Sequence, residues 1–241
     1  MSNRRTKGNV LSDVKLTAEI EPRSPNQSAY LESLQRQTFT FGVGRAGTGK
    51  TLLAVWQAVL ELLSGKNKIH RIIVVRPVIG NKFGESIGAL PGNVADKMLP
   101  YGSSVLDNLK ALMDRDAVIK LIEQDFIEFV PLTLLRGRSL NNAFVIVEEA
   151  QNIRDSSNGI YMVMSRLGAG SKMVFTGDLA QSDLQEEESA LKRAIEILTD
   201  PEKPPMNGLK VVELYDRQDV QRHPLLYEVM ERFGQTDENP F

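Results

Sequence analysis

Residues 39–51 read Phe-Thr-Phe-Gly-Val-Gly-Arg-Ala-Gly-Thr-Gly-Lys-Thr, and they decide the fold. The apolar half of this stretch predicts a strand that ends at Val43, and residues 44–51 fit the pattern G-x-x-x-x-G-K-[ST] in full. The helix predicted behind the pattern has one apolar side, formed by Leu53, Ala54, Ala58 and Leu62. A strand, a glycine-rich loop and a helix in this order predict a phosphate-binding loop.

The residue types in this loop suit a nucleoside triphosphate with Mg²⁺. Glycines adopt backbone angles closed to other residues, so successive N–H groups can converge on a phosphate at the positive end of the helix. Lys50 is predicted to neutralise the β- and γ-phosphate oxygens, and the Thr51 hydroxyl to ligate Mg²⁺. The predicted nucleotide-binding residues of the loop are Gly44, Arg45, Ala46, Gly47, Thr48, Gly49, Lys50 and Thr51. The alternative, a glycine-rich turn that binds nothing, explains four fixed residues in this setting poorly.

Apolar runs of strand length recur along the rest of the chain. They cover residues 71–75, 143–147, 172–175 and 210–214. Apolar residues at i, i+3, i+4 and i+7 predict helices that face the sheet in residues 160–167, 191–198 and 226–233. Because strands alternate with helices, we expect one three-layer α/β domain with a mostly parallel sheet and helices on both faces.

Composition excludes several classes of protein. The 241 residues include no cysteine, so disulfides, zinc fingers and thiol nucleophiles are excluded. Apolar runs stop far short of the ~20 residues that span a bilayer, and no secretory signal is recognised, so we expect a cytoplasmic protein without membrane contact. A net charge of -2 gives no overall attraction to nucleic acid. Residues 1–21 are expected to form a mobile polar arm, and residues 22–241 a single domain.

Two adjacent acids, Glu148 and Glu149, directly follow the strand predicted at residues 143–147. In a parallel sheet this is the carboxyl edge, where ligands bind. Because successive side chains diverge, Glu148 is predicted to hold the Mg²⁺ shell with Thr51, while Glu149 polarises an attacking water. The alternative is a solvated acidic turn. Gln181, beyond the next apolar run, is a further candidate, because a glutamine at such an edge can orient water or sense the γ-phosphate.

Taken in order, these motifs resemble the PhoH-like family of phosphate-starvation-inducible proteins, from about Pro22 to Pro224. Besides the phosphate loop, the similar segments are Pro25-Asn26-Gln27, Arg76-Pro77, Leu90-Pro91-Gly92, Arg136-Gly137-Arg138 with Asn141, Glu149-Ala150-Gln151, Gly170-Ser171-Lys172-Met173 with Thr176-Gly177-Asp178, Gln181, and Arg222-His223-Pro224-Leu225. The resemblance implies a single RecA-like P-loop NTPase domain, related to the core of superfamily 1 helicases. It also implies that ATP is the nucleotide and that Gln27 reads the adenine edge.

Two positions depart from the family pattern. The family usually has Asp-Glu where this chain has Glu148-Glu149, so the acid of the metal shell is one methylene longer and is expected to hold Mg²⁺ through water. The family loop commonly has Pro where this chain has Arg45. That residue adds a cation, which is expected to assist binding or to contact a neighbouring subunit.

Phosphoryl transfer places charge on the γ-phosphate oxygens, which an inserted arginine can stabilise. The candidates are Arg136, Arg138, Arg166 and Arg222, and Arg222 is preferred because it lies in the Arg-His-Pro segment. The predicted catalytic residues are therefore Lys50, Glu149, Gln181 and Arg222. Superfamily 1 helicases bind ATP between two RecA-like domains, whereas this chain is long enough for one. We therefore expect a homo-oligomer, for instance a ring in which an arginine acts in trans.

Three functions are compatible with these residues. The first is a Mg²⁺-dependent ATPase whose cycle acts on a single-stranded nucleic acid, with RNA favoured over DNA. Its expected contacts are Arg136, Arg138 and the polar arm. Its nucleic-acid part rests on analogy with helicases. The second is a phosphotransferase for a small acceptor, although the sequence shows no clear arginine-rich lid. The third is a module that senses ATP without hydrolysing it.

Overall fold

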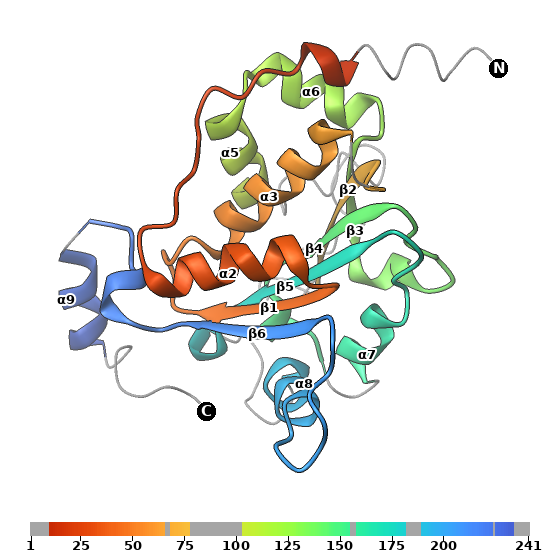
Figure 1. Ribbon diagram of the computed structural model, residues 1–241. Coiled ribbons are helices and arrows are strands. Elements are labelled where there is room, and N and C mark those ends of the chain that lie inside the picture. Colours follow the sequence, from red (N-terminus) through yellow and green to blue (C-terminus); the bar gives the residue numbers. More distant parts are fainter. Residues whose placement is uncertain are drawn as a thin grey trace, which may run out of the picture.

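The computed structural model describes residues 10–65, 68–77, 103–154, 158–181, 189–223 and 225–233. Within them, six strands form one sheet in the order β3-β2-β4-β5-β1-β6, and every neighbouring pair runs parallel (Figure 1). The strands are β1 (Phe39–Gly44), β2 (Arg71–Arg76), β3 (Ile127–Pro131), β4 (Ala143–Val147), β5 (Lys172–Gly177) and β6 (Leu209–Leu214). The expected parallel α/β sheet is confirmed.

Helices cover both faces of this sheet (Figure 1). The α-helices are α2 (Pro25–Arg36), α3 (Lys50–Ser64), α5 (Ser103–Leu112), α6 (Arg115–Glu123), α7 (Gly159–Met164), α8 (Ala190–Leu198) and α9 (Leu225–Arg232). Short 3-10 turns are η3 (Leu132–Leu135), η4 (Ala150–Asn152), η6 (Leu179–Gln181) and η8 (Arg217–Asp219). Each of these turns begins within three residues of the end of a strand, so they lie at the carboxyl edge of the sheet.

Two buried apolar clusters, one on each face, hold the three layers together. Along β4, Phe144 and Ile146 belong to the cluster beneath α2, α3, α5 and α6, whereas Val145 and Val147 belong to the cluster beneath α7 and α8. Alternate residues of a strand point to opposite faces, so a strand that is apolar throughout is buried on both sides. The uniformly apolar runs in the sequence are therefore the inner strands of a covered sheet.

The predicted strands are confirmed, but β3 was not predicted. This strand reads Ile127-Glu128-Phe129-Val130-Pro131 and, among the strands of the described ranges, pairs with β2 alone, so it forms one edge of the described sheet. Pro131 ends it, and Glu128 lies half-buried along it. An edge strand with a charged residue and a proline carries a weaker apolar signal than the central strands.

The helix predicted at residues 226–233 forms as α9, but its apolar face does not lie on the sheet. None of the residues of α9 is buried, Val229 is 40% exposed, and Phe233, directly after the helix, is 77% exposed. Figure 1 shows α9 beside the sheet rather than over either face. The prediction of a sheet-facing helix is wrong here, because the chain first turns through η8 toward the loop after β1 and leaves α9 beyond the sheet.

The segment before α2 packs on the domain from residue 10 onward. Val10, Leu11, Val14 and Leu16 contact the buried cluster under α5 and α6, and the Thr17 N–H donates to the Leu112 carbonyl at 2.8 Å. Residues 10–21 thus do not stand apart as the expected arm, and the expected boundary at residue 22 falls inside a packed segment; residues 1–9 lie outside the described part. Within the described ranges, no helix combines the length and the apolarity needed to cross a membrane.

Candidate functional site

The loop between β1 and α3 has the backbone that the pattern predicts. Gly47 and Gly49 adopt positive φ angles of 80° and 82°, and α3 begins at Lys50 directly after them. These are left-handed angles that residues with a Cβ rarely adopt. A Cβ on Gly44 would lie 2.3 Å from the Leu214 carbonyl oxygen at the end of β6. Three glycines of the motif are therefore needed for turn geometry or close approach, and the amino end of α3 opens at the carboxyl edge of the sheet.

Lys50 lies under this loop and beside two acids. Its ammonium donates to the carbonyls of Gly44 at 2.6 Å and Arg45 at 2.7 Å. Burial lowers the pKa of Lys50 to about 8, and the negative charges of Asp178 and Glu149 oppose that shift. A phosphate bound at the amino end of α3 would favour the charged ammonium, so the lysine is set electrostatically to interact with an anion.

Glu148 and Thr51 meet across the site. The Glu148 side chain is buried, and both of its carboxylate oxygens accept from the Ser104 hydroxyl of α5, at 2.8 and 3.0 Å. Burial raises the pKa of Glu148, while the Ser104 bond, the Arg76 charge and a hydrogen bond with Thr51 oppose the shift. Oxygen ligands from a carboxylate and a hydroxyl fit Mg²⁺, which keeps several waters when it binds with a nucleotide. In the described ranges, no group of three or more His, Cys, Asp or Glu residues could hold a metal ion by itself.

Glu149 is held by Gln151. Its backbone is left-handed, with φ of 52°, where the chain leaves β4 for η4. The Gln151 side-chain amide donates to the Glu149 carboxylate at 2.6 Å, while its carbonyl oxygen accepts from the Asp178 N–H at 3.1 Å. Gln151 is 1% exposed. A buried amide thus holds Glu149 beside Lys50.

Asp178 belongs to the site although it was not among the predicted site residues. It follows β5, the neighbour of β1, and its carboxylate accepts backbone hydrogen bonds from Ala46 of the loop and from Ala180. Burial raises the pKa of Asp178, and the Lys50 charge opposes this shift. The signal was a polar residue directly after an apolar strand. Gln181, which was selected, lies exposed at the end of η6, and its N–H donates to the Asp178 carbonyl.

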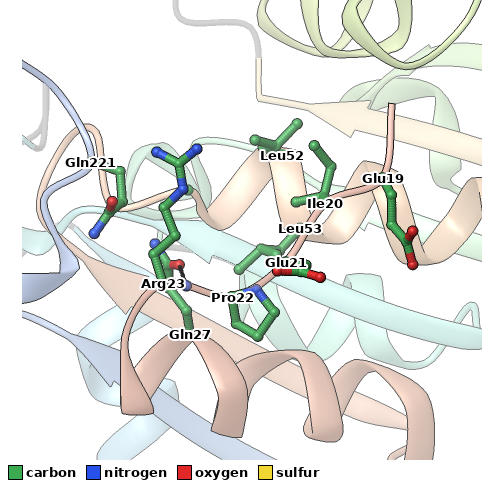
Figure 2. Close-up of a pocket in the computed structure, with 10 residues that line it drawn as sticks. Glu19, Ile20, Glu21, Pro22, Arg23, Gln27, Leu52, Leu53 and Gln221 are labelled. Atoms are coloured by element: carbon green, nitrogen blue, oxygen red, sulfur yellow. Dashed lines mark hydrogen bonds between the residues drawn. The ribbon is translucent and has the colours of Figure 1, made fainter. Parts of the chain in front are cut away.

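Gln27 lies between this loop and a cavity of about 380 Å³ (Figure 2). The cavity is lined by Glu19, Ile20, Glu21, Pro22, Arg23, Gln27, Gly49, Leu52, Leu53 and Gln221. The Gln27 amide donates to the Thr48 carbonyl at 3.0 Å, and its side-chain oxygen accepts from the Arg23 N–H at 2.7 Å. Its side chain therefore joins the phosphate loop to the segment that forms the cavity wall.

The structure separates the candidate arginines. Arg222 lies on the phosphate loop of its own chain, because a Cβ on Gly47 would meet the Arg222 Cγ at 2.5 Å. Arg45 turns away, donating to the Tyr215 carbonyl with its guanidinium 5.9 Å from the Tyr215 ring centre. Arg138 forms two hydrogen bonds of 2.9 Å with Glu128, Arg136 is exposed after η3, and Arg166 donates to a carbonyl of α7. Arg222 is thus the candidate nearest the loop, and it is placed in cis. The Leu90-Pro91-Gly92 segment and Pro224 lie outside the described residues.

A parallel sheet whose β1 runs through a glycine loop into α3, with Lys50 and the acids after β4 at the same edge, defines a P-loop NTPase fold. The family model described as PhoH-like protein matches residues 19–234, and the chain belongs to this family. It is 40% identical to the PhoH-like protein of Bacillus subtilis (strain 168), over 89% of this chain and 64% of the relative.

Two other relatives match at a similar identity and coverage. The PhoH-like protein of Mycobacterium tuberculosis (H37Rv) is 38% identical over 91% of this chain and 59% of the relative, and that of Synechocystis sp. (PCC 6803) is 38% identical over 95% and 66%. The chain thus spans between 59% and 66% of the length of these relatives. A solved Sulfolobus solfataricus SWI2/SNF2 ATPase core in complex with dsDNA is 13% identical, with a TM-score of 0.45 over 82% of this chain and 46% of that chain.

Proposed function

We propose that this protein is a cytoplasmic, Mg²⁺-dependent ATPase. The observation that carries the proposal is that two adjacent acids have different partners: Glu148 meets Thr51, while Gln151 holds Glu149 beside Lys50. A loop that only bound phosphate would not require a second acid held on the lysine side. Phosphate cradle, metal ligands and a base at one sheet edge are the parts that hydrolysis of a γ-phosphate needs.

Each residue has a part in this proposal. The N–H groups of residues 44–51 and the Lys50 ammonium bind the β- and γ-phosphates, while Thr51 and Glu148 hold Mg²⁺, which supplies charge stabilisation on the phosphate oxygens. Gln181 and Arg222 act on the γ-phosphate from the loops after β5 and β6. Gln27 lies at the cavity in which the adenine would bind.

The proposed reaction is an attack by water on the γ-phosphorus. The oxygen of water forms a bond to phosphorus, and the bond from phosphorus to the oxygen that bridges the β- and γ-phosphates breaks. Glu149 accepts the proton that the water loses, and the leaving oxygen remains on ADP. Gln151 keeps the Glu149 carboxylate turned toward the lysine side during this step.

The test is release of inorganic phosphate from ATP by the full chain, with and without Mg²⁺. Steady release that stops on addition of EDTA and in Lys50→Ala supports the ATPase. Binding of ATP without any release would instead indicate a sensor, and phosphate appearing only on an added acceptor would indicate a phosphotransferase.

We further propose that the cycle acts on single-stranded RNA, with single-stranded DNA as the alternative strand. Arg136 supports this because it is exposed, whereas Arg138 is engaged with Glu128. Phosphate release is measured with and without RNA at two salt concentrations. RNA stimulation that weakens in Arg136→Ala but not in Arg36→Ala, a change in an exposed ion pair on α2, supports the contact.

We also propose a homo-oligomer. Because Arg222 lies on the phosphate loop of its own chain, a ring with an arginine acting in trans would need a further arginine supplied by a neighbouring subunit. Light scattering with ATP and Mg²⁺ present measures the mass. A monomeric mass under these conditions would contradict the oligomer.

A further inference from the structure

Asp219 is a completely buried acid that the proposed chemistry does not use. Its exposed fraction is 0%, and its carboxylate accepts three hydrogen bonds. The Ser24 hydroxyl donates to one oxygen at 2.5 Å, and the Asn26 side-chain amide and the Asp216 N–H donate to the other at 3.0 Å each. A buried carboxylate is costly unless such donors compensate it, so the carboxylate is held in one place by three fixed donors.

On one side, this carboxylate fixes the start of α2. Ser24 is the N-cap of α2, and its hydroxyl oxygen accepts from the Gln27 N–H at 3.1 Å while donating to Asp219. The Gln27 side chain also donates to the Asp219 carbonyl at 3.4 Å, beside its bond to Thr48. The orientation of Gln27 at the cavity therefore depends on Asp219 through the cap.

On the other side, Asp219 fixes the turn that reaches the phosphate loop. The Asp219 N–H donates to the Asp216 carbonyl at 2.9 Å and closes η8. A capping box completes the turn, in which the Asp216 side chain accepts from the Asp219 N–H and the Asp219 side chain accepts from the Asp216 N–H. Two residues further on, the Gln221 N–H donates to the Gly47 carbonyl at 2.9 Å. Arg222 then lies against Gly47. The position of Arg222 is thus set by the same turn that Asp219 closes.

We propose that Asp219 is a positioning residue that couples recognition of the base at Gln27 to placement of Arg222 over the phosphate loop. This rests on the proposed nucleotide site, and it assigns the link between its two ends. The link joins segments that are 195 residues apart in the chain, Ser24 and Asp219. Base and γ-phosphate would then be sensed by one connected unit rather than by two independent contacts.

The test variant is Asp219→Asn. Asparagine keeps one oxygen to accept from Ser24 but places an NH₂ group opposite the donors of Asn26 and Asp216, so two hydrogen bonds are lost. The matched control is Asp107→Asn, because Asp107 is an exposed acid of α5 paired with Lys110. Equilibrium binding with Mg²⁺ is measured for non-hydrolysable ATP and GTP analogues and for ADP, so no turnover is needed.

Two preferences are read from these affinities. The wild type should prefer the ATP analogue over the GTP analogue through Gln27, and over ADP through Arg222. Asp219→Asn should lower both preferences, each by roughly tenfold, the scale of a lost hydrogen bond to a charged group. Asp107→Asn should leave both unchanged. A purely structural role would instead lower the affinity for all nucleotides alike.

A cycle with Arg222→Ala then measures the coupling. Arg222→Ala should lower the preference for the ATP analogue over ADP in the wild type, and change it less than about twofold in the Asp219→Asn background. Ser24→Ala, which removes the cap and one of the three donors to Asp219, serves if Asp219→Asn does not fold, and should lower the preference for ATP over GTP. Additive effects, or unchanged preferences, would overturn the proposal. Absence of phosphate release would refute the ATPase without affecting this measurement.

Discussion

Two half-buried lysines lie at opposite edges of the sheet and have different surroundings. Lys172, the first residue of β5, donates to the Glu61 carboxylate at 2.6 Å and to the Leu34 and Gln35 carbonyls at the end of α2. Lys50, at the other edge, donates to carbonyls and the Thr48 hydroxyl. The carboxylates of Glu149 and Asp178 interact with Lys50 through their charges. They accept hydrogen bonds from Gln151 and from the Ala180 N–H, respectively.

The comparison distinguishes an ion pair that stabilises the fold from a site in which the lysine and the acids are held by different groups. At the amino edge, Lys172 and the Glu61 carboxylate form an ion pair, and Lys172 also bonds the end of α2, so the pair connects α2, α3 and β5. At the carboxyl edge the acids are fixed by Gln151, Ala46 and Ala180, so their positions do not depend on the lysine. Chemistry is therefore expected to depend on Lys50, and stability on Lys172.

The largest effect is expected for Lys50→Ala. Removing the cation that neutralises the β- and γ-phosphates should lower turnover roughly 100- to 1000-fold, as loss of one transition-state donor does. The free energy of unfolding at neutral pH should not fall, because no carboxylate is left unpaired. Phosphate release and thermal unfolding measure the two quantities. A variant that loses stability but keeps its turnover would reverse the comparison.

Lys172→Met should have the opposite profile. It leaves Glu61, whose side chain is 4% exposed, buried without its cation, which should cost about 3 kcal/mol of unfolding free energy. Turnover per folded molecule should not change. Denaturant unfolding is the measurement, and Lys110→Met is the control, because its exposed pair with Asp107 should contribute less than about 1 kcal/mol. Equal losses in the two variants would show that the Lys172 pair is not structural.

Gln151→Leu should lower turnover by about tenfold with little change in KM, because Gln151 holds Glu149, the proposed base. Steady-state kinetics separates kcat from KM. Gln35→Leu, an exposed change on α2, is the control. A rise in KM at constant kcat would show that Gln151 serves binding rather than the base.

The burial of Lys50 should also make the stability of the fold depend on pH. The pKa of Lys50 is about 10.5 in the unfolded chain, the ordinary value, and about 8 in the folded chain. Between these values the unfolded chain binds more protons, so the free energy of unfolding should rise with pH from about 8 to 10.5. Denaturant unfolding across this range should lose this component of its slope in Lys50→Met. An identical slope would mean that burial does not perturb Lys50.

Local features of the site could be predicted from the sequence. The loop, Lys50 and Thr51 lie within eight consecutive residues, and the strand before Glu148 marks the edge where ligands bind. Such patterns depend on neighbours in sequence, so no knowledge of strand order is needed.

Features that depend on strand order could not be predicted. Asp178 belongs to the site because β5 lies beside β1, and Asp219 contacts Ser24 because the turn after β6 meets the start of α2. The same limit applies to α9. The spacing of its apolar residues predicts a helix with one apolar side, but not which part of the molecule that side faces. For Arg45, the loop position is local, but its partner Tyr215 follows β6.

The central claim is that the carboxyl edge hydrolyses ATP with Glu149 as the base. The most direct measurement compares ATP binding and phosphate release in the wild type and in Glu149→Gln, which keeps the size of the side chain. The account predicts that Glu149→Gln binds ATP with Mg²⁺ within about threefold of the wild type and releases phosphate at least about 100-fold more slowly. Release at the wild-type rate by Glu149→Gln, or no release by the wild type, would contradict it.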